Sequence, residues 1–327
     1  MHAILATEPG GPDVLAPDEI GDPLPGPRDL LVRVSAAGVN FIDVYQRNGT
    51  YPMPFPHVPG SEGAGVVEAV GSAVREFTVG DLVAWASAPS SYAELVVVPE
   101  VVALRVPDGV RDEVAAALPL QGLTAHYLVT STFPVEPGQD VLVHAGAGGV
   151  GLLLTQLAAA RGARVITTVG TPEKEALSRA AGAADVIRYT ELGDLTDELP
   201  ALVRDLTGGR GVHTVFDGVG RSTFDASLAS LRRRGGLALF GASSGPVPPL
   251  DPQRLNAAGS VYLTRPTLGH HTATREELTW RAGELFDAVA AGTLDVRIGA
   301  TFPLTEAEEA HRALEGRRTT GKVLLTA

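Results

Sequence analysis

The sequence predicts an α/β protein that combines a β-rich domain with a doubly wound parallel sheet. Two observations lead to this fold class. Up to about residue 120, short apolar segments alternate with turns rich in Gly and Pro, which is typical of a compact, barrel-like β domain. From Gly122 onward, strand-like and helical segments alternate, which is typical of a parallel sheet covered by helices on both faces.

The first part has short strands expected at 30–36, 63–70, 82–86 and 92–98, with a short helix within 39–49 and another from residue 112. The second part has strands expected at 141–143, 164–169, 185–188, 212–217, 236–240 and 261–263, with helices that include 194–206 and 224–231. After Pro266, a helix at 275–291 and strands at 297–302 and 322–326 are expected to return to the first part. The predicted domains are therefore 1–120 together with 267–327, and 121–266.

A glycine-rich turn follows the strand predicted at 141–143. Gly146, Gly148 and Gly151 have the G-x-G-x-x-G spacing of a dinucleotide-binding turn, and Leu152 opens an apolar run at helical spacing. Such a turn brings a pyrophosphate close to backbone N–H groups at the helix N-terminus. The alternative is an α/β turn without a ligand. His144, beside the glycines, is interpreted as a core histidine with satisfied hydrogen bonds.

The end of the next strand indicates which dinucleotide is bound. An NAD site usually carries Asp or Glu roughly 20 residues after the glycines, where it binds the ribose hydroxyls. Here the strand runs into Gly170 and Thr171 without an acid, and Lys174 follows. A missing carboxylate and a nearby cation suit a 2′-phosphate, so the prediction is NADPH, with these three residues at its adenosine end. The alternative is that Lys174 is a solvated residue at a helix start, paired with Glu173 or Glu175.

Composition argues against several classes of function. The net charge of −12 disfavours general nucleic-acid binding, and the basic run Arg232–Arg234 is interpreted as a solvated helix end. No run of about 18 apolar residues predicts a membrane span, and the N-terminus does not read as a secretory leader. Because cysteine is absent, disulfides and thiolate-held metals are excluded. A cytoplasmic location is the resulting expectation.

Five short segments extend this interpretation: AGVNFID (37–43), PGSEGAG (59–65), GLTA (122–125), AGAGGVG (145–151) and Thr-Arg-Pro (264–266). With them the chain resembles, from end to end, the medium-chain dehydrogenases and reductases, and among these the zinc-independent quinone oxidoreductases related to zeta-crystallin. The resemblance implies a GroES-like catalytic domain at 1–120 and 267–327 and a Rossmann NADPH-binding domain at 121–266. The cofactor is then expected in the crevice at the carboxyl ends of the parallel strands.

The resemblance also implies roles for individual residues. Asn40 and Tyr45 match positions at the nicotinamide end of the cofactor, and Thr124 matches a threonine near its ribose. The other implied cofactor contacts are Gly148, Gly149, Val150, Lys174, Tyr189, Phe240, Gly241 and Arg317. A one-residue slip would substitute Arg318 for Arg317. Asn40 and Thr124 have the alternative role of helix caps, and Tyr45 that of a half-buried core aromatic.

The resemblance predicts a site without metal. Zinc-dependent relatives place a cysteine at the position of Asn40 and a histidine at that of Ser61, and both are replaced here. A quinone or an enone suits such a site, because either delocalises the charge that a hydride brings. Tyr45 is the candidate catalytic donor to the reduced oxygen, with Asn40 as a neutral donor, and solvent is the alternative proton source.

Three functional hypotheses follow. The first is NADPH-dependent quinone reduction, the second is reduction of an α,β-unsaturated carbonyl such as an alkenal or enoyl thioester, and the third is NADPH binding without turnover. A small-molecule quinone or enone is the expected partner in the first two. The strand at 261–263 is expected at the edge of the parallel sheet, where relatives pair two copies, so a homodimer is expected.

Overall fold

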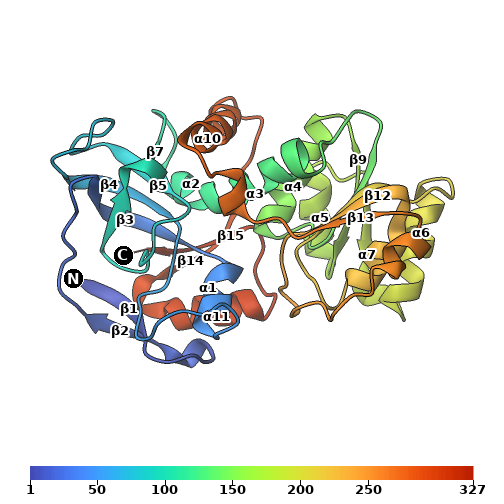
Figure 1. The fold of residues 1–327 in the computed structure, drawn as a ribbon, viewed down its shortest axis with the longest axis horizontal. Helices are drawn as coiled ribbons and strands as arrows, with labels where there is room; N and C mark the ends of the chain where they lie inside the picture. The colour runs from blue at the N-terminus through green and yellow to red at the C-terminus, as the bar shows by residue number, and fades with distance from the viewer. Residues whose placement is uncertain (327) are drawn as a thin grey trace. The chain divides into compact units, whose positions relative to one another are not determined.

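A computed structural model describes residues 1–326, which form two compact units (Figure 1). Unit 1 comprises Met1–Leu123 and the described residues from Thr272 onward, and unit 2 comprises Thr124–His271. The predicted limits at 120/121 and 266/267 lie close to these. The predicted limit at 120/121 and the observed one at 123/124 both fall within α3 (Pro119–Tyr127). No helix within residues 1–326 is long and apolar enough to cross a membrane.

Unit 1 is organised by a mixed sheet around the long strand β3 (Asp29–Val39). This strand pairs antiparallel with β4 (Gly63–Val70), β6 (Leu95–Pro99) and β15 (Lys322–Thr326), so the C-terminal strand returns to the first domain as predicted. The other elements of the unit are β1 (His2–Ala6), β2 (Leu15–Glu19), β5 (Leu82–Trp85), β7 (Leu104–Arg105), β14 (Ile298–Pro303), α1 (Phe41–Arg47), α2 (Asp112–Ala117), α10 (Arg275–Ala290) and α11 (Ala307–Glu315).

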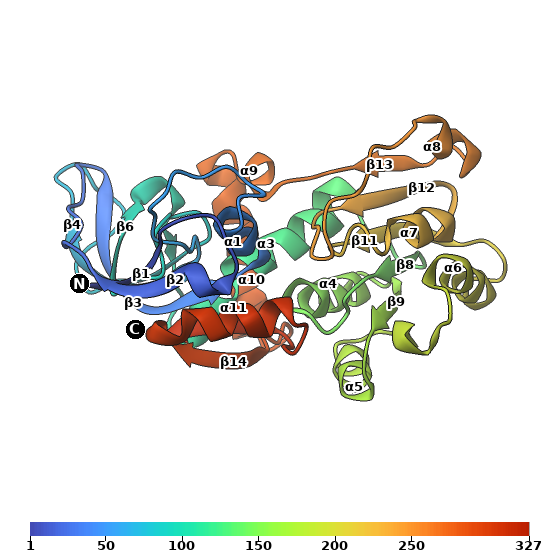
Figure 2. The ribbon, with the colours of Figure 1, turned by 90° about the horizontal axis from the view of Figure 1, so that it is seen from below.

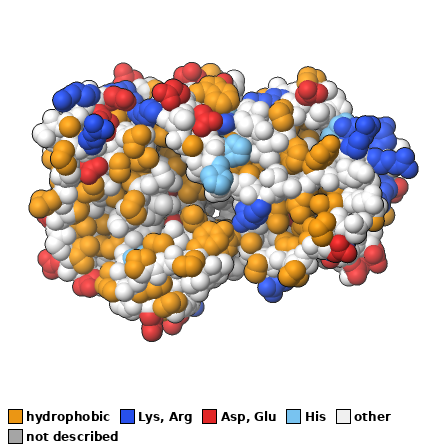
Figure 3. Space-filling view, viewed as in Figure 1, with side chains coloured by type: hydrophobic (Ala, Val, Ile, Leu, Met, Phe, Trp, Pro, Cys, Tyr) orange, Lys and Arg blue, Asp and Glu red, His pale blue; other side chains and the backbone are white. Residues whose placement is uncertain are grey.

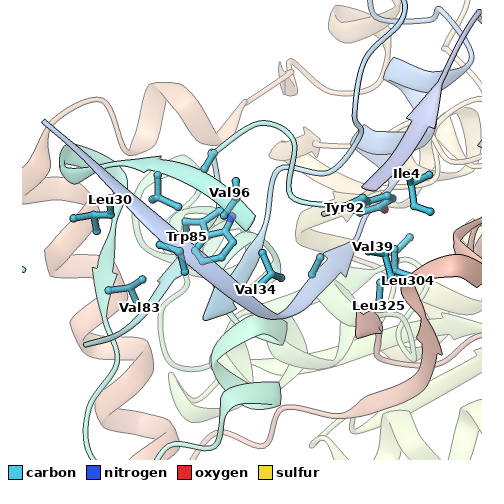
Figure 4. Packing of buried hydrophobic residues seen from close by; sticks show 14 of the residues in the cluster. Ile4, Leu30, Val34, Val39, Val83, Trp85, Tyr92, Val96, Leu304 and Leu325 are labelled. Atoms are coloured by element: carbon cyan, nitrogen blue, oxygen red, sulfur yellow. The ribbon is translucent and has the colours of Figure 1, made fainter. Parts of the chain in front are cut away.

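The core of unit 1 holds two fully buried aromatic residues, Trp85 and Tyr92 (Figure 4). Trp85 donates its Nε1–H to Ser91 Oγ at 2.9 Å, so its polar atom is paired. The ring of Tyr92 belongs to the same apolar cluster as Ile4, Val39, Leu304 and Leu325. Its hydroxyl donates to Asp43 Oδ2 at 3.0 Å, which links the apolar core to helix α1.

Unit 2 is built on a parallel sheet with the strand order β10-β9-β8-β11-β12-β13, much of which can be followed in Figure 2. At its centre lie β8 (Asp140–Val143) and β11 (Val212–Asp217), where the chain order changes direction across the sheet. Ligands of doubly wound sheets bind at such a switch point. The other elements are β9 (Arg164–Val169), β10 (Asp185–Arg188), β12 (Leu231–Leu239), β13 (Tyr262–Thr264), α4 (Gly149–Ala160), α5 (Pro172–Ala180), α6 (Leu195–Leu206), α7 (Phe224–Ser230), α8 (Gln253–Ala257) and α9 (Leu268–His271). The predicted fold class is confirmed.

The interpretation of Arg232–Arg234 as a helix end is wrong. Helix α7 ends at Ser230, and the three arginines lie on the first part of β12 with exposed side chains. The pairing of β12 with β11 is irregular at this point, and Arg234 has a positive φ of 58°. On the face drawn in Figure 3, basic side chains gather over one end of unit 2 within a surface of otherwise mixed charge.

Candidate cofactor and active site

The glycine turn depends on two close backbone approaches. A Cβ on Gly151 would collide with the carbonyl oxygen of Ala145, so only glycine lets α4 begin directly above the turn. A Cβ on Gly146 would lie 2.6 Å from Cβ of Thr167 on β9, which is shorter than any real contact. These two glycines therefore serve the packing of strand, turn and helix.

Gly148 has a different environment, because a Cβ there would meet only the Ala145 carbonyl oxygen, at 3.2 Å. Gly148, Gly149 and Val150 are all partly exposed, and Gly148 immediately precedes α4. The first N–H groups of a helix have no partner within the helix, and the helix dipole attracts an anion to them. This open helix start fits a pyrophosphate, and it brings together the three residues predicted for that role.

The end of β9 carries the predicted adenosine-phosphate residues. The Thr171 hydroxyl caps α5 by accepting the backbone N–H of Lys174 at 3.3 Å, which places Lys174 in the first turn of that helix. The space beside Gly170 is taken by Tyr189, whose hydroxyl would lie 2.7 Å from a Cβ at Gly170. Gly170, Thr171, Lys174 and Tyr189 thus form one local group within unit 2.

Glu175, beside Lys174, forms two ion pairs with arginines. Its carboxylate forms ion pairs with Arg179 Nη2 at 2.8 Å and with Arg188 Nε at 3.2 Å. β9 ends at Val169, and the following Gly170 and Thr171 bring no acid to the strand tip. The charge pattern at this strand end therefore suits a phosphate better than a ribose diol.

Three further residues of unit 2 are predicted cofactor contacts: Thr124, Phe240 and Gly241. Phe240 and Gly241 follow β12 directly, with the Phe240 N–H donating to Asp217 O at 2.9 Å and Gly241 packed on the backbone of Gly218. They therefore lie at the carboxyl ends of β11 and β12. Thr124 is 7% exposed and belongs to α3.

The sequence did not reveal a buried polar network beneath this strand edge. His144 Nδ1 lies 2.9 Å from Thr168 Oγ1, and His144 Nε2 lies 2.9 Å from Ser227 Oγ. Ser227 donates to Asp217 Oδ2 at 2.7 Å, so its oxygen accepts from Nε2–H, which assigns the proton of His144 to Nε2. Burial lowers the pKa of His144, opposed by the charge of Asp217. The expected satisfied core histidine is confirmed, but its partners are distant in sequence.

In unit 1, Asn40 and Tyr45 lie at the start and in the body of α1. Asn40 is 4% exposed, and its amide nitrogen donates to Glu62 Oε2 at 2.7 Å and to Gly38 O at 3.2 Å. Donation from Asn40 to a substrate would therefore require one of these bonds to break. Tyr45 is half-buried, with its ring centroid 5.3 Å from that of Tyr51.

A chain of buried polar groups continues from α1 into unit 1. Arg47 Nη1 donates to His311 Nδ1 at 2.9 Å, and the other nitrogen of His311 lies 3.1 Å from the Tyr92 hydroxyl, which donates to Asp43. Burial and the charge of Arg47 lower the pKa of His311 to about 3. Burial raises the pKa of Asp43 to about 7, against the hydrogen bond from the Asn40 N–H. These groups hold α1 in place.

Arg317 follows α11, with an exposed side chain and a positive φ of 56°. Its neighbour Arg318 forms an ion pair with Glu309 at 2.9 Å. The choice between Arg317 and Arg318 as a phosphate-binding residue therefore stays a prediction.

A cavity of about 300 Å³ in unit 2 lies away from these residues. It is lined by Phe133, Pro134, Gln139, His213, Thr214, Arg232, Arg234, Gly236 and Tyr262. These residues lie at the amino ends of β8, β11, β12 and β13, whereas the glycine turn follows the carboxyl end of β8. The cavity is therefore not part of the candidate cofactor site.

The sequence models of two families match this chain. The family described as "Alcohol dehydrogenase GroES-like domain" matches residues 26–108, and the family described as "Zinc-binding dehydrogenase" matches residues 149–282. A quinone oxidoreductase from Pseudomonas aeruginosa is 45% identical over 97% of this chain and 96% of its own length. The chain belongs to the quinone oxidoreductase family of the medium-chain dehydrogenases and reductases. The resemblance found in the sequence is thereby confirmed.

Two further proteins are similar over nearly the whole chain. The structure of mycobacterial Rv1454c complexed with NADPH has a TM-score of 0.97 at 56% identity, covering 100% of both chains. A 2-haloacrylate reductase from a Burkholderia species is 40% identical over 99% of this chain and 98% of its own length.

One of the matching families is described as zinc-binding, yet the donors of this family member do not fit zinc. Within residues 1–326, no three His, Cys, Asp or Glu side chains are placed to hold a metal ion. The Asn40 amide is taken up by hydrogen bonds, and the Ser61 hydroxyl is not a usual zinc ligand. Zinc independence stays a prediction that metal analysis can test.

Proposed function

We propose that this chain is a zinc-independent, NADPH-dependent quinone oxidoreductase. The observation that carries the proposal is the strand edge of unit 2, where an open glycine turn is accompanied by Lys174 and no acid at the tip of β9. The relatives support it, since several are named quinone oxidoreductases and one solved neighbour is an NADPH complex.

The residues present fit NADPH. Gly148, Gly149 and Val150 would hold the pyrophosphate on backbone N–H groups, and Lys174 with Gly170, Thr171 and Tyr189 would hold the 2′-phosphate. The contacts implied by the family resemblance complete the proposed set: Asn40, Tyr45, Thr124, Phe240, Gly241 and Arg317.

When bound, NADPH supplies the hydride. Reduction of a quinone to a hydroquinone takes one hydride and one further proton, so the protein must admit or donate a proton at the acceptor oxygen. We assign that donation to the Tyr45 hydroxyl, with Asn40 as a neighbouring neutral group, and water is the alternative source. The fixed position of α1 keeps Tyr45 oriented for this role.

A second candidate function is reduction of α,β-unsaturated carbonyls. The 40% identity to a 2-haloacrylate reductase over nearly the whole chain favours it specifically. Stopped-flow oxidation of enzyme-bound NADPH by a panel of quinones and enones separates the two functions. Faster oxidation by quinones supports the first, faster oxidation by enones supports the second, and oxidation by neither rejects both in favour of NADPH binding without turnover.

We further propose a homodimer and a cytoplasmic location. β13 pairs with β12 on one side, and within residues 1–326 no strand pairs with the other side of β13. Tyr262 on β13 is 61% exposed. Such an edge can extend a sheet into a second copy. Light scattering that gave a monomer mass at micromolar concentration would reject the dimer.

A further inference from the structure

A buried ion pair lies at the start of β15 in unit 1. Lys322 Nζ contacts Glu62 Oε2, and the two side chains are 1% and 0% exposed. Glu62 Oε2 also accepts the Asn40 amide N–H at 2.7 Å, and Glu62 Oε1 accepts the backbone N–H of Leu120 at 2.7 Å. One carboxylate therefore binds donors from three separate segments of unit 1.

This pair determines the orientation of the Asn40 amide. An ammonium group only donates hydrogen bonds, and a carboxylate only accepts them. Lys322 Nζ donates to Asn40 Oδ1 at 2.8 Å, while the amide nitrogen of Asn40 faces Glu62. Rotating the amide by half a turn would bring its N–H groups toward the ammonium and its oxygen toward the carboxylate. Only one orientation is therefore compatible with the pair.

The segments joined by the pair lead into residues of the proposed site. Asn40 directly precedes α1, which carries Tyr45, and the Asn40 backbone N–H donates to Asp43 on that helix at 2.8 Å. Leu120 lies in the first turn of α3, which carries Thr124. A carboxylate at a helix start is also favoured by the helix dipole. Glu62 thus holds the starts of two helices that carry proposed site residues.

We propose that Lys322 and Glu62 are positioning residues, which orient the Asn40 amide and hold the starts of α1 and α3 for the reaction proposed above. The inference rests on that proposed function. The pair acts through Asn40, Tyr45 and Thr124 and does not itself touch the substrate.

The test uses the double variant Lys322→Met/Glu62→Gln, because removing either charge alone would leave the other buried without a partner. The double variant contains no uncompensated charge and keeps side chains of similar length. Asn40→Ala is the second variant, since it keeps the Lys322–Glu62 pair and removes only the oriented amide. Arg33→Met/Glu68→Gln is the matched control, because that pair is an exposed ion pair on β3 and β4.

We expect both test variants to lower kcat for the preferred acceptor by about fivefold or more at a temperature where each is folded, since small misplacements cost up to about 10²-fold in rate. In the double variant the dissociation constant of NADPH, governed mainly by unit 2, should change less than about twofold, and the control should match wild type. A folded double variant with wild-type kcat would overturn the inference. If the double variant does not fold, a wild-type kcat in Asn40→Ala would overturn the inference instead. Wild-type protein without turnover of any acceptor would instead reject the proposed function, and the inference with it.

Discussion

His144 Nε2 lies 2.9 Å from Ser227 Oγ, although the two residues are 83 positions apart in the chain. Ser227 in turn donates a hydrogen bond to Asp217. Buried polar atoms therefore connect the turn after β8 with the end of β11. The connection lies directly beneath the strand edge proposed to bind the cofactor.

Ser227→Ala should lower the free energy of unfolding by about 1–3 kcal/mol, because the His144 N–H and one Asp217 oxygen lose a buried partner. Ser230→Ala is the control, since Ser230 is buried in the same helix but donates only to the Ala226 carbonyl oxygen. Urea denaturation measures both. Equal losses in the two variants would show that the network adds nothing to stability.

Lys174→Ala should weaken NADPH binding by about 10- to 100-fold and NADH binding much less, because only NADPH has the 2′-phosphate that the ammonium would pair with. Arg179→Ala is the control on the same helix, where Arg179 pairs with Glu175. Fluorescence titration with both nucleotides gives the two ratios. Matched losses for NADPH and NADH would reject the phosphate assignment.

Tyr45→Phe should lower kcat by more than it changes the dissociation constant of NADPH, because it removes the proposed donor and keeps the ring. General acid catalysis contributes roughly 10²-fold or more where a side chain supplies the proton. Tyr51→Phe, which alters the neighbouring ring of the same aromatic cluster, should leave kcat unchanged. Wild-type turnover in Tyr45→Phe would assign the proton to water.

The buried His311 should make stability depend on pH. An unfolded histidine has a pKa of about 6.5, whereas burial and Arg47 lower the pKa of His311 to about 3 in the fold. Between these values the unfolded chain binds a proton that the folded chain does not, so the free energy of unfolding falls as pH falls, by up to about 1.4 kcal/mol per pH unit.

His311→Gln removes this titration while keeping a donor toward Tyr92. The stability advantage of wild type over the variant should therefore shrink between about pH 6.5 and pH 3. The quantity to compare is the difference in free energy of unfolding between wild type and the variant. Asp43, with its pKa raised to about 7, makes the free energy of unfolding depend on pH with the opposite sign in both proteins. A difference that stays constant across this range would contradict the assignment.

Dialysis against a strong chelator should leave quinone reduction unchanged, and elemental analysis of the untreated protein should find far less than one zinc per chain. The reason is the donor set, which within residues 1–326 offers no group of three suitable ligands. Added zinc serves as the control. Activity that is lost with the chelator and restored by zinc would disprove the prediction.

Local patterns were sufficient to predict much of the fold. The glycine turn and the strands at 164–169 and 212–217 are confirmed as β9 and β11, because apolar periodicity and glycine spacing act over a few neighbouring residues. The prediction for Arg232–Arg234 is wrong because a run of charged residues is equally compatible with an exposed helix end and an exposed strand start.

The buried polar contacts between distant residues cannot be predicted from local sequence patterns. Asn40 and Lys322 are 282 positions apart, and nothing near Lys322 indicates that its ammonium is buried. Such pairs are set by how distant strands pair, here β3 with β15, and single-chain periodicity carries no information on that. For the same reason the sequence offered Asn40 as a donor to substrate, without showing that its amide already has partners.

Unit 2 is formed by one uninterrupted segment, whereas unit 1 is assembled from two. During synthesis on the ribosome, residues 124–271 are all made before residues 322–326. Strand β3 meanwhile keeps an open edge, and Glu62 lacks its cation, until residues 322–326 have left the exit tunnel. The sheet of unit 1 can therefore be completed only after all of unit 2 has been synthesised, although unit 1 begins first along the chain.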